Sequence, residues 1–148
     1  MKQSIAEAVS LEGSCHCGAI RATLVATMPA AELQARACQC GFCTRHGAMT
    51  VSDPAGLATF EITRAGLNRY RFETRTGTSL LCARCGMYAG VILEDEGKIW
   101  SAINVRGLAI PEFKDRTAEP VVYEGESPQA RTARRKQKWT PTEIVYVR

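Results

Sequence analysis

Long hydrophobic runs are absent from this sequence of 148 residues. No apolar stretch approaches the roughly 20 residues that a membrane-spanning helix needs. Residues 1–10 also lack the continuous apolar stretch of a secretory signal, so we expect a cytoplasmic protein without a membrane partner. Hydrophobic residues make up 45% of the chain and charged residues 23%, as in ordinary globular proteins, which predicts a single domain over residues 1–148.

Charge of one sign is also scarce, because the net charge is only +4. A charge of this size gives a mild attraction to anions and does not by itself indicate nucleic-acid binding. The sequence has no internal repeats beyond its cysteine clusters, and its only biased tract is the basic segment 131–138.

Cysteine, in contrast, is abundant, with seven residues. Cytoplasmic thiols stay reduced, and an odd number does not favour a framework of disulfides. Every cysteine lies in one of three short clusters, whereas packing alone would not place buried cysteines two or three positions apart. The pattern therefore indicates metal sites. The clusters are Cys15-His16-Cys17-Gly18, Cys38-Gln39-Cys40-Gly41-Phe42-Cys43 and Cys82-Ala83-Arg84-Cys85-Gly86.

The outer clusters together supply four thiolates for one structural zinc ion. Cys82 and Cys85 form a Cys-x-x-Cys pair followed by glycine, the usual zinc knuckle. Cys15 and Cys17 point to the same side if their segment is extended, which leaves His16 on the other side. Closing the intervening loop costs roughly 4 kcal/mol, and zinc binding returns roughly 10 to 16 kcal/mol. We assign these four cysteines to a closed structural site.

The middle cluster leaves Cys38, Cys40 and Cys43 without a further cysteine. Three protein ligands and one open position are the general form of a catalytic zinc site. The alternative is that His46 supplies a fourth ligand and closes a structural Cys₃His site. Three thiolates make bound zinc a poor activator of water but a good partner for an incoming thiol.

Periodicity predicts an antiparallel sheet. Gly18–Ala26 alternates apolar and polar residues and reads as a half-buried strand, and a similar strand is expected at Tyr70–Thr74. The apolar runs Tyr88–Leu93 and Lys98–Val105 are separated by a charged turn containing glycine, which predicts a hairpin. Pro29–Arg36 fits a short helix or an extended segment.

The cysteine clusters and their neighbours resemble the glutathione-dependent formaldehyde-activating enzymes and their centromere-protein-V-like relatives. The resemblance runs from about Leu11 to Leu108. The motifs that carry it are Gly13-Ser-Cys15-His-Cys17-Gly18, Cys38-Gln-Cys40-Gly-Phe-Cys43-Thr-Arg-His-Gly47, Leu81-Cys82-Ala-Arg-Cys85-Gly86 and Ile103-Asn-Val-Arg106.

The resemblance implies a mainly β, Mss4-like fold of several small coiled antiparallel sheets held by structural zinc. It also implies two zinc ions, a structural one on Cys15, Cys17, Cys82 and Cys85 and a catalytic one at Cys38, Cys40 and Cys43. The activity that it implies is that of a carbon–sulfur lyase, S-(hydroxymethyl)glutathione synthase, with glutathione as co-substrate and a small aldehyde as partner.

Two arginines are candidates for binding the thiol substrate. Arg45 lies two residues beyond Cys43, where a guanidinium could hold a carboxylate through two hydrogen bonds. Arg106 matches the family's Asn-x-Arg, in which we interpret Asn104 as structural.

The competing hypothesis is a noncatalytic zinc module that binds a protein or a nucleic acid. In that case both metals are structural, and the basic segment near Trp139 supplies affinity for phosphates. A disordered or solvated segment is the expectation for this tract, since it contains a single tryptophan. Its basic residues are Arg131, Arg134, Arg135, Lys136 and Lys138.

Overall fold

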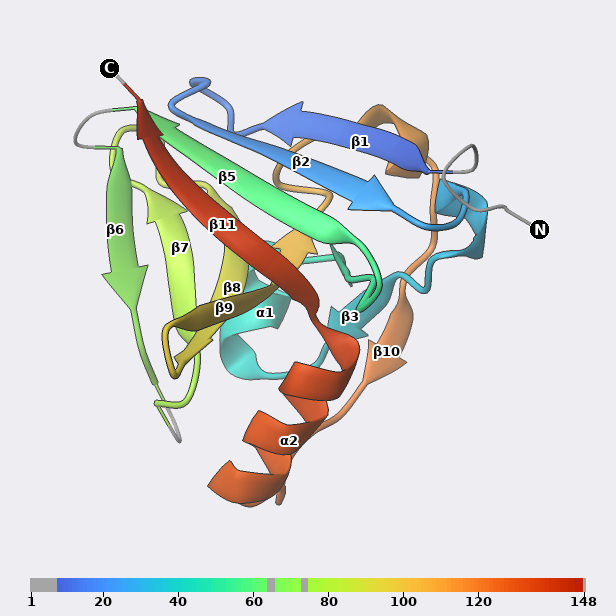
Figure 1. The fold of residues 1–148 in the computed structure, drawn as a ribbon, viewed down its shortest axis with the longest axis vertical. Helices are drawn as coiled ribbons and strands as arrows, with labels where there is room; N and C mark the ends of the chain where they lie inside the picture. Colours follow the sequence, from blue (N-terminus) through green and yellow to red (C-terminus); the bar gives the residue numbers. More distant parts are fainter. Residues whose placement is uncertain (1–7, 64–65, 73–74, 148) are drawn as a thin grey trace.

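A computed structural model describes residues 8–63, 66–72 and 75–147. The protein is mainly β, as expected from the sequence (Figure 1). The helices of the described residues are α1 (Gly41–His46) and α2 (Pro128–Lys138), with 3₁₀ turns at Ala30–Glu32 and Pro111–Phe113. The strands are β1 (Val9–Ser14), β2 (Ile20–Ala26), β3 (Arg36–Cys38), β4 (Thr50–Val51), β5 (Leu57–Thr63), β6 (Leu67–Tyr70), β7 (Thr78–Cys82), β8 (Tyr88–Asp95), β9 (Lys98–Asn104), β10 (Glu119–Val121) and β11 (Thr140–Val147).

The strands form one connected, mixed sheet with the order β1-β2-β5-β11-β9-β4-β3-β10, and β8, β7 and β6 continue from β9. Most pairs are antiparallel, but β11 runs parallel to β5, and β10 runs parallel to β3. The last strand joins the two halves of the fold: Thr140 and Pro141 pair with β9, and Thr142–Val147 pairs with β5. Figure 1 shows β1, β2, β5 and β11 side by side, with β6 to β9 to the lower left of them in this view.

The core lies between these two halves. On β2 the residues Ile20, Ala22 and Leu24 are buried and alternate with more exposed neighbours, which confirms the predicted strand. Phe60 of β5 packs close to Gly90 of β8, where a Cβ atom would lie 2.9 Å from the carbonyl oxygen of Ala102. This close approach is possible only for glycine and lets the two layers pack tightly.

The predicted hairpin is confirmed as β8 and β9. Asp95 pairs with Lys98, so the turn consists of Glu96 and Gly97, both with positive φ, at 54° and 78°. Two positive φ angles define the type I′ turn that suits the twist of a hairpin. The 3₁₀ turn and β3 occupy most of Pro29–Arg36, so this segment is partly helical and partly extended.

The strand expected at Tyr70–Thr74 lies earlier in the chain. In the structure β6 pairs with β7 from Leu67 to Tyr70, and Arg71 and Phe72 follow it without strand pairing. Residues 73–74 lie outside the described residues.

The basic segment 131–138 is not disordered, because it lies in α2, and it is solvated only in part, since Lys138 is exposed but Arg131 is buried. Ser127 caps the helix by accepting a hydrogen bond from the Ala130 N–H, and Pro128 begins its first turn. At the other end Trp139 is buried against Leu93 and Ala102. None of the described helices combines the length and apolar character needed to cross a membrane.

Candidate zinc sites and ligand cavity

The fold brings Cys15 and Cys17 against Cys82 and Cys85, as predicted. Their four sulfur atoms lie within 4.8 Å of one another. The Sγ atoms of Cys15 and Cys17 are 3.8 Å apart, and those of Cys17 and Cys82 are 3.5 Å apart. A tetrahedral zinc site with Zn–S bonds of 2.3 Å separates its sulfurs by about 3.8 Å. The spacing of these four thiols therefore fits zinc.

Backbone N–H groups surround this group of sulfurs. The N–H of Ile20 donates to Cys15 Sγ at 3.3 Å, and the N–H groups of Arg84 and Cys85 each donate to Cys82 Sγ at 3.4 Å. Such donors stabilise thiolate and orient it toward a metal. Each cysteine pair is followed by a glycine with positive φ, Gly18 at 85° and Gly86 at 81°, which completes the turn.

The thiol pKa values in this group diverge. Burial is the main cause that raises the pKa of Cys15 to about 11. Burial also acts to raise the pKa of Cys85, but hydrogen bonds from the backbone N–H groups of Cys17 and Met87 and from Cys82 and Cys15 lower it to about 6. The raised pKa keeps the proton on Cys15 at neutral pH unless a cation lies beside its sulfur, so a set of four thiolates needs a cation among them.

Cys38, Cys40 and Cys43 form the second group, again with sulfurs within 4.8 Å of one another. Cys38 ends β3, Cys40 caps α1, and Cys43 lies within the helix. The N–H of Cys43 donates to Cys40 Sγ at 3.3 Å, so the first turn of α1 aligns two of the three sulfurs. Hydrogen bonding with Cys38, followed by burial, raises the pKa of the Cys43 thiol. This donor set also fits zinc, which would replace the thiol protons.

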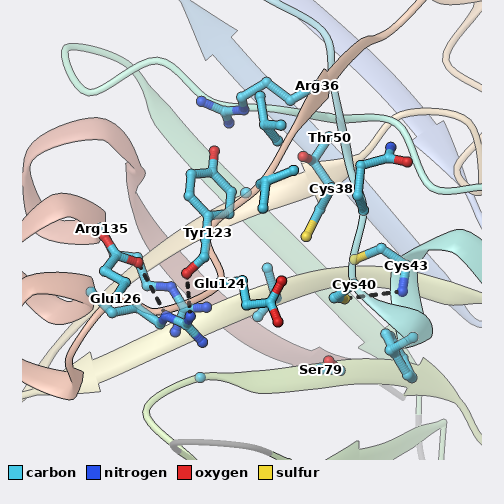
Figure 2. A pocket seen from close by; sticks show the side chains of 18 of the residues that line it. Arg36, Cys38, Cys40, Cys43, Thr50, Ser79, Tyr123, Glu124, Glu126 and Arg135 are labelled. Atoms are coloured by element: carbon cyan, nitrogen blue, oxygen red, sulfur yellow. Dashed lines mark hydrogen bonds and ion pairs between the residues drawn. The ribbon is translucent and has the colours of Figure 1, made fainter.

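The three-cysteine group lies on the wall of a cavity of about 540 Å³ (Figure 2). This volume is within the range of small-molecule sites in proteins. Besides the cysteines, the cavity is lined by Phe42 of α1, Phe72, residues of β8 and β9, the segment 121–126 and α2. In Figure 2 the carboxylate of Glu124 projects into the space between the cysteines and the arginines. The four-cysteine group does not line this cavity.

Tyr88 forms part of the floor, fully buried beneath the three cysteines. Burial, and next the charge of Cys43, Cys38 and Cys40, raise the pKa of the Tyr88 phenol well above 10. Tyr88 is therefore a hydrogen-bond donor at neutral pH. Asn104 fixes its backbone by donating to the Tyr88 carbonyl at 2.8 Å, and accepts a hydrogen bond from the Met49 N–H at 3.0 Å. These bonds agree with the structural interpretation of Asn104.

The wall opposite the cysteines is basic and comes mainly from α2. Glu126 accepts hydrogen bonds from Arg131 at 3.1 Å and from Arg134 at 2.9 Å, and Arg134 also lies 3.6 Å over the ring of Tyr123. Arg135 lines the same wall, and Arg36 of β3 contributes a fourth arginine. Hydrogen bonding to Arg134 is the main cause that lowers the pKa of Glu126.

The arginines predicted to contact the substrate lie elsewhere. Arg45 is exposed on α1, where its Nη1 donates to the Gly41 carbonyl at 3.1 Å, and Arg106 donates to the Gly47 carbonyl at 3.1 Å. Neither residue lines the cavity. His46 is exposed and belongs to neither group of potential ligands among the described residues, and the same is true of His16. The ring of His46 packs 4.6 Å from that of Phe42.

The cavity residues after position 120 were not predicted from the sequence. The signal was present in part, because Ser127-Pro128 is a typical helix start and Arg131, Arg134, Arg135 and Lys138 follow helical spacing. That spacing puts these side chains on one helix face, which could have predicted a concentrated basic surface. It could not indicate that the surface faces the cysteines.

Known proteins share features with this chain in sequence and in fold. The family profile described as "Glutathione-dependent formaldehyde-activating enzyme" matches residues 10–120. A crystal structure of a Rhodobacter sphaeroides protein is similar in fold, with a TM-score of 0.58 and 25% identity, over 74% of this chain and 99% of the other. No curated protein matches the sequence significantly. The cysteine groups, the mainly β fold and the match over residues 10–120 together show that this chain belongs to the glutathione-dependent formaldehyde-activating enzyme family.

Proposed function

We propose that this protein is a zinc-dependent carbon–sulfur lyase that joins glutathione, or a similar small thiol, to a small aldehyde. With formaldehyde the product is S-(hydroxymethyl)glutathione: the thiol sulfur bonds to the aldehyde carbon, and the carbonyl oxygen takes the proton that the thiol loses. The observation that carries this proposal is the group of three cysteines on the wall of a cavity of small-molecule size, in a chain of this family.

In this proposal Cys38, Cys40 and Cys43 hold the catalytic zinc, and the other four cysteines hold a structural one. Zinc bound by three thiolates supplies a Lewis acid with an affinity for a further sulfur, at which a thiol loses its proton readily. The cavity confines the aldehyde beside that sulfur and limits access of water.

Two residues of the cavity are suited to move the proton. The carboxylate of Glu124 projects toward the cysteines, so it can accept the thiol proton and return it to the oxygen of the product. The phenol of Tyr88 keeps its proton at neutral pH and can donate a hydrogen bond to the aldehyde oxygen as negative charge develops there. Cytoplasmic glutathione would supply the thiol, which is consistent with a cytoplasmic location for the enzyme.

The noncatalytic module is less well supported, because that hypothesis requires an exposed basic segment to supply the affinity for a protein or a nucleic acid. Arg131 is buried, Arg131 and Arg134 are paired with Glu126, and Arg135 lines the cavity. The arginines of α2 therefore lie mainly at the cavity and do not form a flat outer surface that could contact nucleic acid.

Alkylation in the presence of glutathione tests the proposal. Zinc-loaded protein is treated with iodoacetamide with and without glutathione, the excess reagents are removed, and modification of each cysteine is measured by mass spectrometry. We expect glutathione to protect Cys38, Cys40 and Cys43 more than the other four cysteines, which serve as an internal control. Uniform protection, or none, would argue for the noncatalytic module, as would a failure of the protein to accelerate condensation of formaldehyde with glutathione.

A further inference from the structure

Among the described residues that line the cavity, arginines outnumber carboxylates: Arg36, Arg131, Arg134 and Arg135 accompany Glu124 and Glu126. Arg131 and Arg134 share the carboxylate of Glu126, with N–O distances of 3.1 and 2.9 Å. Arg36 donates to the hydroxyl of Ser52 at 2.7 Å, a neutral partner. Among the described residues no carboxylate lies within ion-pair distance of Arg135. Of the three α2 arginines that line the cavity, Arg135 is therefore the one without a carboxylate partner among the described residues.

Arg135 is held in a fixed orientation. Its Nη1 donates to the hydroxyl of Thr76 at 3.0 Å, and its guanidinium lies 4.6 Å from the centre of the Trp139 ring. Gly77 allows this approach, because a Cβ atom there would lie 2.8 Å from Nη1. A guanidinium fixed in advance loses little side-chain freedom when it binds a ligand.

The other edge of this guanidinium is unsatisfied. The Nε of Arg135 is buried and has no hydrogen-bond partner among the described residues, and no described residue bonds its Nη2. Leaving a buried charged donor unpaired costs free energy, so such a group is expected to have a partner in the working protein. Burial, followed by the charges of Arg134 and Arg131, lowers the pKa of Arg135 to about 10, which still leaves it charged at neutral pH.

We propose that Arg135 is a specificity-determining residue, whose Nε and Nη2 bind a carboxylate of the thiol substrate while the sulfur lies at the three cysteines. This inference rests on the proposed function and identifies the substrate class as a thiol that carries a carboxylate, as glutathione does. The Nε–Nη2 edge offers two parallel N–H groups, which match the two oxygens of a carboxylate.

The arrangement of charges in the cavity places the carboxylate on this wall. Glu124 lies between the arginines and the cysteines and repels an anion from the middle of the cavity (Figure 2). The sulfur and the carboxylate must therefore bind at opposite sides, which requires a ligand with several atoms between them. Arg135 also lies beyond residues 10–120, so this subsite comes from outside the part of the chain that matches the family.

Calorimetric titration of the zinc-loaded, full-length protein tests the inference with three probes. Glutathione carries both a thiol and carboxylates, S-methylglutathione keeps the carboxylates but cannot form a thiolate, and 2-mercaptoethanol has a thiol without a carboxylate. We expect Arg135→Ala to weaken binding of the two glutathione compounds by about 10- to 100-fold and to leave 2-mercaptoethanol unchanged. The matched control is Arg21→Ala, which removes an exposed arginine of β2 outside the cavity.

The outcomes separate this inference from the proposed function. If Arg135→Ala binds glutathione as tightly as the wild type does, the subsite is contradicted but the proposed function is not. An equal loss of affinity for all three probes would also contradict the subsite, because it indicates a structural effect. A third outcome is that the wild type binds S-methylglutathione through Arg135, while glutathione and 2-mercaptoethanol bind no more tightly than S-methylglutathione. This result would support the subsite and contradict the proposed thiol chemistry. If no probe binds the wild type, both the subsite and the proposed function are contradicted.

Arg135→Lys is the second variant, for the case that Arg135→Ala does not fold. It retains the charge but not the paired N–H groups, so we expect the affinity for the two glutathione compounds alone to fall by about tenfold.

Discussion

Glu126 is the residue on which the basic wall of the cavity depends. Its carboxylate is only slightly exposed and pairs with Arg131 and Arg134, whose side chains are also largely covered. Without it Arg131 and Arg134 would lie beside Arg135 without the carboxylate that pairs with them. The pairing therefore helps to hold α2 against the rest of the protein and to position the neighbouring Arg135.

Glu126→Gln should destabilise the protein by about 1 to 3 kcal/mol at neutral pH, because it removes the negative charge that pairs with Arg131 and Arg134. The pKa of Glu126 is lowered from its ordinary value of 4.5 by the hydrogen bond to Arg134. A lowered pKa in the folded state means that the unfolded state binds the proton more readily. The stabilisation is thus complete above pH 4.5 and is lost as the pH falls through the folded-state pKa.

Urea unfolding of both proteins from pH 7 to pH 3 checks this prediction. The difference in unfolding free energy between wild type and Glu126→Gln should be largest at pH 7 and should shrink below pH 4.5. Glu112→Gln, at an exposed position, is the control and should change little. A difference that is constant with pH would show that the ion pairs do not account for the effect.

His46 is the residue at which the two interpretations of the second cysteine group differ. It lies on the exposed side of α1, and its ring contacts Phe42 and Tyr88. We expect His46→Ala to retain two zinc ions per chain, because the proposed ligands are the three cysteines. Metal analysis of the purified variant is the measurement. Loss of one zinc ion relative to wild type would identify His46 as a ligand and remove most of the case for catalysis here.

At the scale of elements, the two cysteine groups differ in what they connect. Cys15 and Cys17 follow β1, and Cys82 ends β7, so the first group ties together segments that are distant in the chain. The second group is local, because its cysteines lie between the end of β3 and α1. A metal bound by the first group would offset the conformational entropy that is lost when a long loop closes. A metal bound by the second group would constrain only a short segment.

Cys82→Ser should therefore lose soluble protein, while Cys43→Ser should remain soluble with a melting temperature close to that of wild type. The two variants are matched in chemistry, since each replaces one buried thiol by a hydroxyl. Soluble yield and thermal unfolding under the same conditions give the comparison. Equal losses in both variants would contradict the division into structural and catalytic zinc.

At the scale of the whole molecule, the C-terminal segment completes the fold. The last strand, β11, lies between β5 and β9 and joins the two halves of the sheet. Its first residue, Thr140, also accepts a hydrogen bond from the Asp53 N–H at 2.7 Å. The helix before it packs on the β8–β9 hairpin, where Lys136 pairs with Asp95. The family match ends at residue 120, yet the sheet is continuous only with the residues that follow.

Truncation after residue 127, which removes α2 and β11, should abolish cooperative unfolding. It would expose the edges of β5 and β9 and uncover the apolar side of the sheet. Circular dichroism during heating checks this, with Tyr146→Ser as the control because Tyr146 is 61% exposed on the same strand. A truncated protein that melts as cooperatively as the full chain would show that residues 1–127 fold on their own.

The sequence by itself determined the features that depend on local spacing. Cysteines two or three positions apart can act as paired ligands wherever they lie, so each cysteine cluster could be read directly as a set of potential metal ligands. Alternation in β2 and the turn between β8 and β9 are likewise local, and both were predicted correctly. Asn104 was interpreted as structural, in agreement with its buried hydrogen bonds to two other segments.

Only the tertiary structure decided which side chains face the three cysteines. Arg45 and Arg106 are near that group in sequence or motif but lie outside the cavity, whereas Arg135 is distant in sequence and lines it. A helix of basic residues carries no local signal of its partner, because charge can face solvent or a buried carboxylate with the same spacing. The position of α2 follows from β11, whose pairing with both β5 and β9 is a long-range property of the folded chain.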